Sequence, residues 1–139
     1  MAAPTSLTQL RIVHLALVAS SVVVPGVVWW ARVMPGAAPP VSAATGSILY
    51  VGLSVGILAL LVGIAAWRGI PAYEPAAELT QWLRTTAPRM VVTWGLCEGA
   101  AVIAAITYFV TGDTIVCGAL AAAAVIGVIV HSPGKLAAS

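Results

Sequence analysis

The chain of 139 residues is 61% hydrophobic and only 7% charged, and its mean hydropathy is +1.07. A soluble domain is typically about 25% charged, so six Lys/Arg, four Asp/Glu and two His cannot cover a core this apolar. The composition excludes a soluble globular protein and a disordered chain, and a net charge of +2 is too small for a surface that binds nucleic-acid phosphates. We therefore expect a small integral membrane protein that contacts lipids and has no nucleic-acid partner.

Four apolar segments reach or nearly reach the length of a membrane-spanning helix, which is about 20 residues. They cover residues 12–31, 48–67, 90–110 and 114–130. None alternates as the strands of a membrane barrel do, and helices satisfy their own backbone hydrogen bonds, as lipid requires. The predicted fold class is all-α, a polytopic four-transmembrane-helix bundle made of two antiparallel hairpins, with residues 1–139 forming a single integral membrane domain. The first segment is longer than a usual signal-peptide core, so we expect it to be retained.

The segments that connect these runs differ in character. Residues 32–47 contain three prolines and are expected to form an irregular loop, whereas Thr111-Gly112-Asp113 is typical of a tight turn. The polar segment 68–89 is predicted to be a cytoplasmic loop. Within it, residues 76–86 follow a proline and form either a short amphipathic helix on the membrane surface or a solvated loop.

The placement of positive charges predicts the orientation. With four spans, the N-terminus, the segment 68–89 and the C-terminus lie on one side of the membrane. That side carries Arg11, Arg68, Arg84, Arg89 and Lys135, and the other carries only Arg32. We expect a multi-pass protein of the bacterial cytoplasmic (inner) membrane, with its N- and C-termini in the cytoplasm.

Glu98 is the most informative residue within an apolar run. It lies roughly 12 Å from the cytoplasmic end of the third run at 1.5 Å per residue, where a carboxylate usually faces a partner, a cavity or a proton path. Ser20 and Ser21 in the first run lie at a similar depth by residue count and are candidate hydrogen-bond partners. Two roles for Glu98 stay open: an ion-binding residue that carries protons, and a neutral carboxyl that joins two helices.

Two Gly-x-x-x-Gly patterns indicate close helix packing. Gly52 and Gly56 lie in the second run, and Gly95 and Gly99 lie in the third. The patterns suggest that these two helices pack closely, either within one chain or between chains.

Other residue types give no catalytic or cofactor site. His14 and His131 lie near the cytoplasmic ends of the first and fourth runs, where a neighbouring pair has the chemistry to ligate haem or a metal. Both are close to the interface, where an imidazole is simply hydrated, so we predict no metal, haem, pigment or other cofactor.

Cys97 and Cys117 differ in height by roughly 15 Å in an antiparallel hairpin, too far for a disulfide. The soluble segments are too short for a catalytic domain, and we do not expect an enzyme.

The middle of the chain resembles a known hairpin. The elements that carry the resemblance are Gly52-Leu-Ser-Val-Gly56, Gly63, a polar loop with Glu74-Pro75, and Trp94-Gly-Leu-Cys-Glu98-Gly-Ala-Ala-Val-Ile103. Their order is similar to that in the proteolipid (c) subunit of rotary ATP synthases. The resemblance implies that Glu98 carries protons and that Gly52 and Gly56 pack inside a ring. It covers about half of the chain. The family's Arg-Gln-Pro loop and denser glycine ladder are absent, and the first and fourth runs are additional.

The whole chain is similar to small, uncharacterised four-helix bacterial inner-membrane proteins. These share small residues and a Glu on the third helix, a short turn and a fourth helix that ends near a proline, here Pro133. We therefore expect an accessory or scaffold subunit of a larger membrane complex, which binds other membrane subunits or forms a homo-oligomer. The alternatives are a proteolipid-like oligomer that translocates protons through Glu98, and a small transporter or cofactor-binding bundle that uses His14 and His131.

Overall fold

The computed structural model describes residues 6–37, 45–74 and 78–133, and the regular elements of these residues are all helices. The helices are α1 (Leu7–Val33), α2 (Thr45–Arg68), α3 (Leu79–Thr111) and α4 (Thr114–Val130). The all-α prediction is confirmed. Three of the helices, α1, α2 and α3, are long and apolar enough to cross a membrane. The fourth, α4, has 17 residues, which corresponds to about 26 Å at 1.5 Å per residue.

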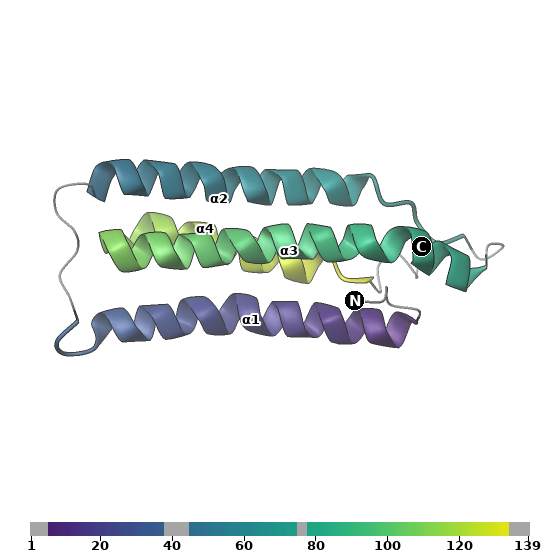
Figure 1. The fold of residues 1–139 in the computed structure, drawn as a ribbon, viewed down its shortest axis with the longest axis horizontal. Helices are drawn as coiled ribbons and strands as arrows, with labels where there is room; N and C mark the ends of the chain where they lie inside the picture. Colours follow the sequence, from purple (N-terminus) through teal and green to yellow (C-terminus); the bar gives the residue numbers. More distant parts are fainter. Residues whose placement is uncertain (1–5, 38–44, 75–77, 134–139) are drawn as a thin grey trace.

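The central helix of the bundle is α3. Figure 1 shows α1 and α2 on opposite sides of α3, with α4 behind it. The chain runs in one direction along α1 and α3 and in the opposite direction along α2 and α4 (Figure 1). The predicted antiparallel hairpin of α3 and α4 turns at Gly112, whose φ of 75° suits a glycine. The predicted hairpin of α1 and α2 does not form, because α3 lies between these two helices.

The start of α3 differs from the prediction. It begins at Leu79 rather than at residue 90, so half of the predicted loop 68–89 is helical and continuous with the apolar run. The physical reason is a buried stripe at helical spacing, made by Trp82, Leu83, Thr86, Ala87 and Met90. Pro88 lies on the exposed side of the helix and does not end it. Of the predicted surface helix, residues 76 and 77 lie outside the described part of the chain.

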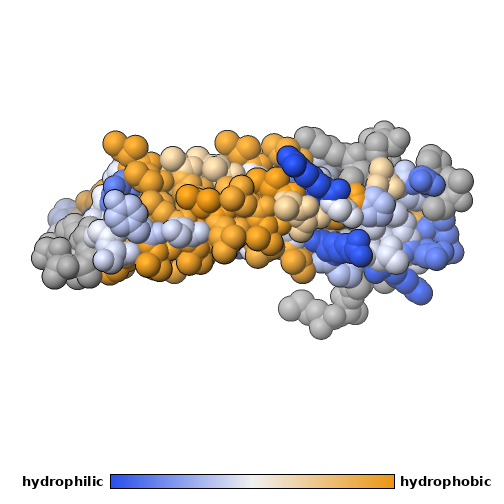
Figure 2. Space-filling view, turned by 90° about the horizontal axis from the view of Figure 1, so that it is seen from above, coloured by the Kyte–Doolittle hydropathy of each residue, from blue (hydrophilic) through white to orange (hydrophobic). Residues whose placement is uncertain are grey.

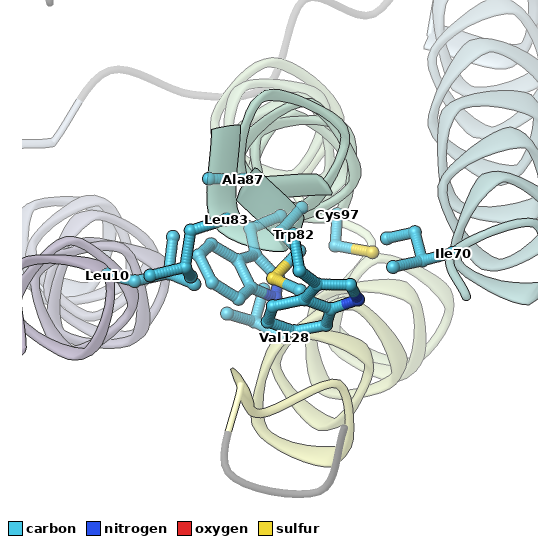
Figure 3. Close-up of a cluster of buried hydrophobic side chains, with 9 residues drawn as sticks. Leu10, Ile70, Trp82, Leu83, Ala87, Cys97 and Val128 are labelled. Carbon is cyan, nitrogen blue, oxygen red and sulfur yellow. The ribbon is translucent and has the colours of Figure 1, made fainter. Parts of the chain in front are cut away.

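A cluster of buried side chains joins the helices at the end where α1 and α3 begin. It contains Leu10, Ile70, Trp82, Leu83, Ala87, Met90, Trp94, Cys97 and Val128. In Figure 3, Leu10 approaches α3 from α1, Val128 approaches from α4, and Ile70 approaches from the segment that follows α2. The Trp82 indole donates a hydrogen bond of 3.1 Å to the Pro71 carbonyl, which fixes that segment against α3.

The same end of the bundle carries most of the charge. We call it the basic end, because Arg11, Arg68, Arg84 and Arg89 belong to it. Figure 2 shows hydrophilic residues gathered towards this end and a hydrophobic surface over the middle of the bundle. Lys135, the fifth charge used to predict the orientation, lies outside the described residues.

Candidate functional site: Glu98 and the open face of α3

Contacts at three levels hold α1 against α3. From the basic end they are the rings of His14 and Trp94, with centroids 4.8 Å apart, the hydrogen bond between Ser20 and Glu98, and the stacked rings of Trp29 and Tyr108, with centroids 4.6 Å apart. Because α1 and α3 run in parallel, residues at equal depth meet along their whole contact. Glu98 is therefore a member of the α1–α3 interface.

The Ser20 hydroxyl lies within hydrogen-bond distance of two oxygen atoms. One is Glu98 Oε1, and the other is the backbone carbonyl oxygen of Leu17, 3.1 Å away. A hydroxyl has one proton to donate, and a carbonyl oxygen only accepts. Ser20 therefore donates either to the Glu98 carboxyl group or to the Leu17 carbonyl, and rotation of the hydroxyl exchanges the two acceptors.

The second oxygen of Glu98 differs from the first in its contacts within the described part of the chain. Glu98 is partly exposed, and Oε2 has no hydrogen-bond partner among residues 6–37, 45–74 and 78–133. Ser21, the other serine considered as a partner, is buried and donates to the Val18 carbonyl at 2.9 Å instead. Glu98 thus has one side held by α1 and one side able to accept a hydrogen bond from outside the described chain.

Three glycines of α2, which are Gly52, Gly56 and Gly63, lie in its contact with the rest of the bundle. A Cβ atom at Gly52 would lie 2.1 Å from Thr107 Oγ1, and one at Gly56 would lie 2.7 Å from Leu120 Cδ2. Gly63, which sequence analysis did not select as a packing position, would place a Cβ 3.1 Å from the Cys97 sulfur. The missing side chains are what allows α2 to approach its neighbours so closely.

Gly95 and Gly99 make no such contact. A Cβ at either position would have no neighbouring atom within 4 Å. Both lie on an exposed or partly exposed side of α3, which we call the open face and which consists of Gly95, Gly99, Val102 and Ile106. At its edge nearest α2, Ile106 also lines a groove shared with that helix. Glu98 adjoins Gly99 at the edge of this face nearest α1. The second Gly-x-x-x-Gly pattern is therefore unused within the described chain.

His14 and His131 cap the end of α4. The last carbonyls of a helix lack donors from the helix itself, and because a carbonyl only accepts, the nitrogen atom facing it is the donor. Nε2 of His14 donates to the Val128 carbonyl at 2.8 Å, and Nδ1 of His131 donates to the Gly127 carbonyl at 2.5 Å. The Trp94 indole donates to the His131 carbonyl at 2.7 Å. These donors give both histidines a structural role.

No role is predicted for Trp94 from the sequence. The available signal is its indole N–H, which needs an acceptor when it is buried in an apolar run.

The described residues contain no group of three or more His, Cys, Asp or Glu side chains that could hold a metal ion. Both cysteines, Cys97 and Cys117, are free and buried. The absence of a cofactor or metal in the functional protein stays a prediction.

No protein-family model, curated protein or solved structure matches this chain. The resemblance of residues 52–103 to the proteolipid hairpin stays a prediction based on the residues that carry it.

Proposed function

We propose that the protein is an accessory or scaffold subunit of a larger membrane complex, with no catalytic activity of its own. The observation that carries this proposal is the open face of α3. It combines two glycines without neighbours with the free carboxyl oxygen of Glu98 beside them. In lipid, helices associate through close packing at small residues and through interhelical hydrogen bonds, and this face offers both. Its occupant in this proposal is a transmembrane helix of another subunit with a hydrogen-bond donor at the level of Glu98.

In this proposal, all four helices cross the bacterial cytoplasmic membrane, and the basic end and both termini face the cytoplasm. The asymmetry of the arginines supports this orientation, because Arg32 is the one arginine at the opposite end. The hydrocarbon core of a bilayer is about 30 Å thick, slightly more than the length of α4. Side-chain donors on the Val128 and Gly127 carbonyls in the last turn of α4 support a crossing by this short helix, since they reduce the cost of unpaired backbone groups.

The proposal is tested with a photo-crosslinking amino acid at Ile106, which lies on the open face and is 57% exposed. In native membranes, we expect this position to form an adduct with another protein. The matched control is the same amino acid at Val23, which is 59% exposed on α1 and is expected to form adducts with lipid alone. Gly99→Leu, which adds a side chain where a Cβ meets no atom, should leave the thermal stability unchanged and remove the protein adduct. Lipid adducts alone at Ile106, or an adduct that survives Gly99→Leu, would contradict the proposal.

A second function, reversible protonation of Glu98 in a proteolipid-like oligomer, is favoured by the geometry around Ser20. When Glu98 releases its proton, rotation of one hydroxyl lets Ser20 donate to the carboxylate instead of to the Leu17 carbonyl. The two functions differ in proton flux across liposomes. Glu98→Gln would abolish flux in a proton-carrying oligomer, whereas an accessory subunit gives no flux with either side chain.

A further inference from the structure

We propose that a groove between α2 and α3 at the basic end binds an anionic phospholipid. The groove has a volume of about 410 Å³ and is lined by Ala66, Gly69, Pro88, Arg89 and Val92. Arg89 is the one charged residue of this lining. An arginine beside apolar walls fits a molecule in which an anionic group is joined to apolar chains.

The Arg89 guanidinium is available to an anion. Arg89 is exposed, and no carboxylate among the described residues forms an ion pair with it. A guanidinium binds phosphate oxygens through two parallel N–H donors, which gives a stronger contact than one neutral hydrogen bond. The other three arginines of the basic end outnumber its two described glutamates, Glu74 and Glu78, and so add to the positive potential that attracts an anionic headgroup.

The positions of the lining residues match the two parts of a phospholipid. Because α2 and α3 are antiparallel, Ala66 at the end of α2 and Gly69 just after it lie beside the α3 turn from Arg89 to Val92. Arg89 is nearer the basic end, where the headgroup lies. Val92 is one turn further into the apolar part of the bundle and is 59% exposed, so the acyl chain lies over Val92 and Ala66. The groove is nearer the basic end than the open face, and its occupation does not depend on the proposed partner helix.

The test measures binding of phosphatidylglycerol and phosphatidylcholine to the full chain, purified in mild detergent, by native mass spectrometry. We expect phosphatidylglycerol to bind about tenfold more tightly, the factor expected for a charge-assisted hydrogen bond. Arg89→Gln should remove this preference. The matched control is Arg11→Gln, which makes the same charge change at an exposed position of α1 and should change the affinity less than about twofold, as a distant screened charge does.

A second variant tests whether the lipid occupies the groove, without changing the charge or the stability of the protein. Ala66→Leu fills the groove without changing the charge, and it should weaken phosphatidylglycerol binding while the unfolding temperature without lipid stays unchanged. Inorganic phosphate and glycerol phosphate, which lack acyl chains, should not compete with the lipid. The proposal is overturned if the two lipids bind equally, if Arg11→Gln and Arg89→Gln reduce binding equally, if Ala66→Leu has no effect, or if the free phosphates compete as well as the lipid. If Arg89→Gln does not fold, the Ala66→Leu result decides the question.

Discussion

Replacing Trp94 with alanine is expected to lower the free energy of unfolding by about 3–5 kcal/mol, the usual range for deletion of a fully buried aromatic side chain. Trp94 is 0% exposed. Its ring lies 4.8 Å from the His14 ring and 6.4 Å from the Trp67 ring, between centroids, and its indole donates to the His131 carbonyl. Alanine removes the packing between α1, α2 and α3 and also leaves the carbonyl at the end of α4 without its donor. Unfolding in mild detergent, followed by circular dichroism, measures the loss.

The matched control for this prediction is Trp94→Phe. Phenylalanine keeps an aromatic ring but has no N–H, and because the His131 acceptor is only partly buried, the substitution should cost about 1 kcal/mol, the net contribution of a typical intramolecular hydrogen bond. The order wild type, Trp94→Phe, Trp94→Ala is therefore expected for stability. A loss below about 1 kcal/mol for Trp94→Ala, well under the range for such deletions, would contradict the position of Trp94 at the junction of the helices.

Leucine at Gly52 is expected to separate α2 from α3. Even the Cβ atom would lie 2.1 Å from Thr107 Oγ1 and 2.9 Å from Thr107 Cγ2, and the Thr107 hydroxyl is held by a hydrogen bond of 2.7 Å to the Ile103 carbonyl. Overpacking of this kind costs about 1–3 kcal/mol and occasionally more. Because α2 packs mainly on α3, we expect Gly52→Ala to lower the free energy of unfolding by about 1–3 kcal/mol and Gly52→Leu to lower it further. Unfolding in mild detergent, followed by circular dichroism, measures both losses.

Two comparisons make the Gly52 prediction specific. Gly95→Leu changes a glycine of the other Gly-x-x-x-Gly pattern and should not lower stability, because a Cβ there meets no atom within 4 Å. Thr107→Ala removes the two closest atoms and should restore part of the stability lost in Gly52→Ala, which a double-mutant cycle detects. Equal losses for Gly52→Leu and Gly95→Leu, or no recovery with Thr107→Ala, would show that the α2–α3 contact is not the one described.

The length of each apolar run predicted the helices well, since hydropathy reports directly which residues can lie in lipid. The prediction for residues 114–130 coincides with α4. Helix α1 begins earlier than residue 12, because Ser6 caps it by accepting a hydrogen bond of 3.2 Å from the Gln9 amide. The early start of α3 was missed because Arg84, Pro88 and Arg89 interrupt the apolar run on the exposed side of the helix, while the buried stripe continues on the other side.

Which surfaces meet was harder to predict from the sequence. The contact between Ser20 and Glu98 was predictable from their depth in the membrane, counted in residues from the helix ends. The reason is that residues at equal depth lie side by side in two parallel helices. A Gly-x-x-x-Gly pattern indicates a surface that can pack closely but does not identify the partner, so it could not distinguish Gly52, which lies against Thr107, from Gly95, which has no neighbour. The acceptor for His14 is a backbone carbonyl, which every residue type has, so no sequence pattern points to it.

The central proposal is that the helices cross a membrane with the basic end in the cytoplasm. Labelling of an introduced cysteine with a membrane-impermeant maleimide, in a chain whose Cys97 and Cys117 are replaced by alanine, tests it most directly. Met34→Cys places a thiol after α1, where the native side chain is 44% exposed, and Ala72→Cys places one at an exposed position after α2. In intact bacterial cells, position 34 should be labelled, and position 72 should be labelled only after the membrane is opened. Labelling of position 72 in intact cells, or recovery of the protein in the soluble fraction, would contradict the account.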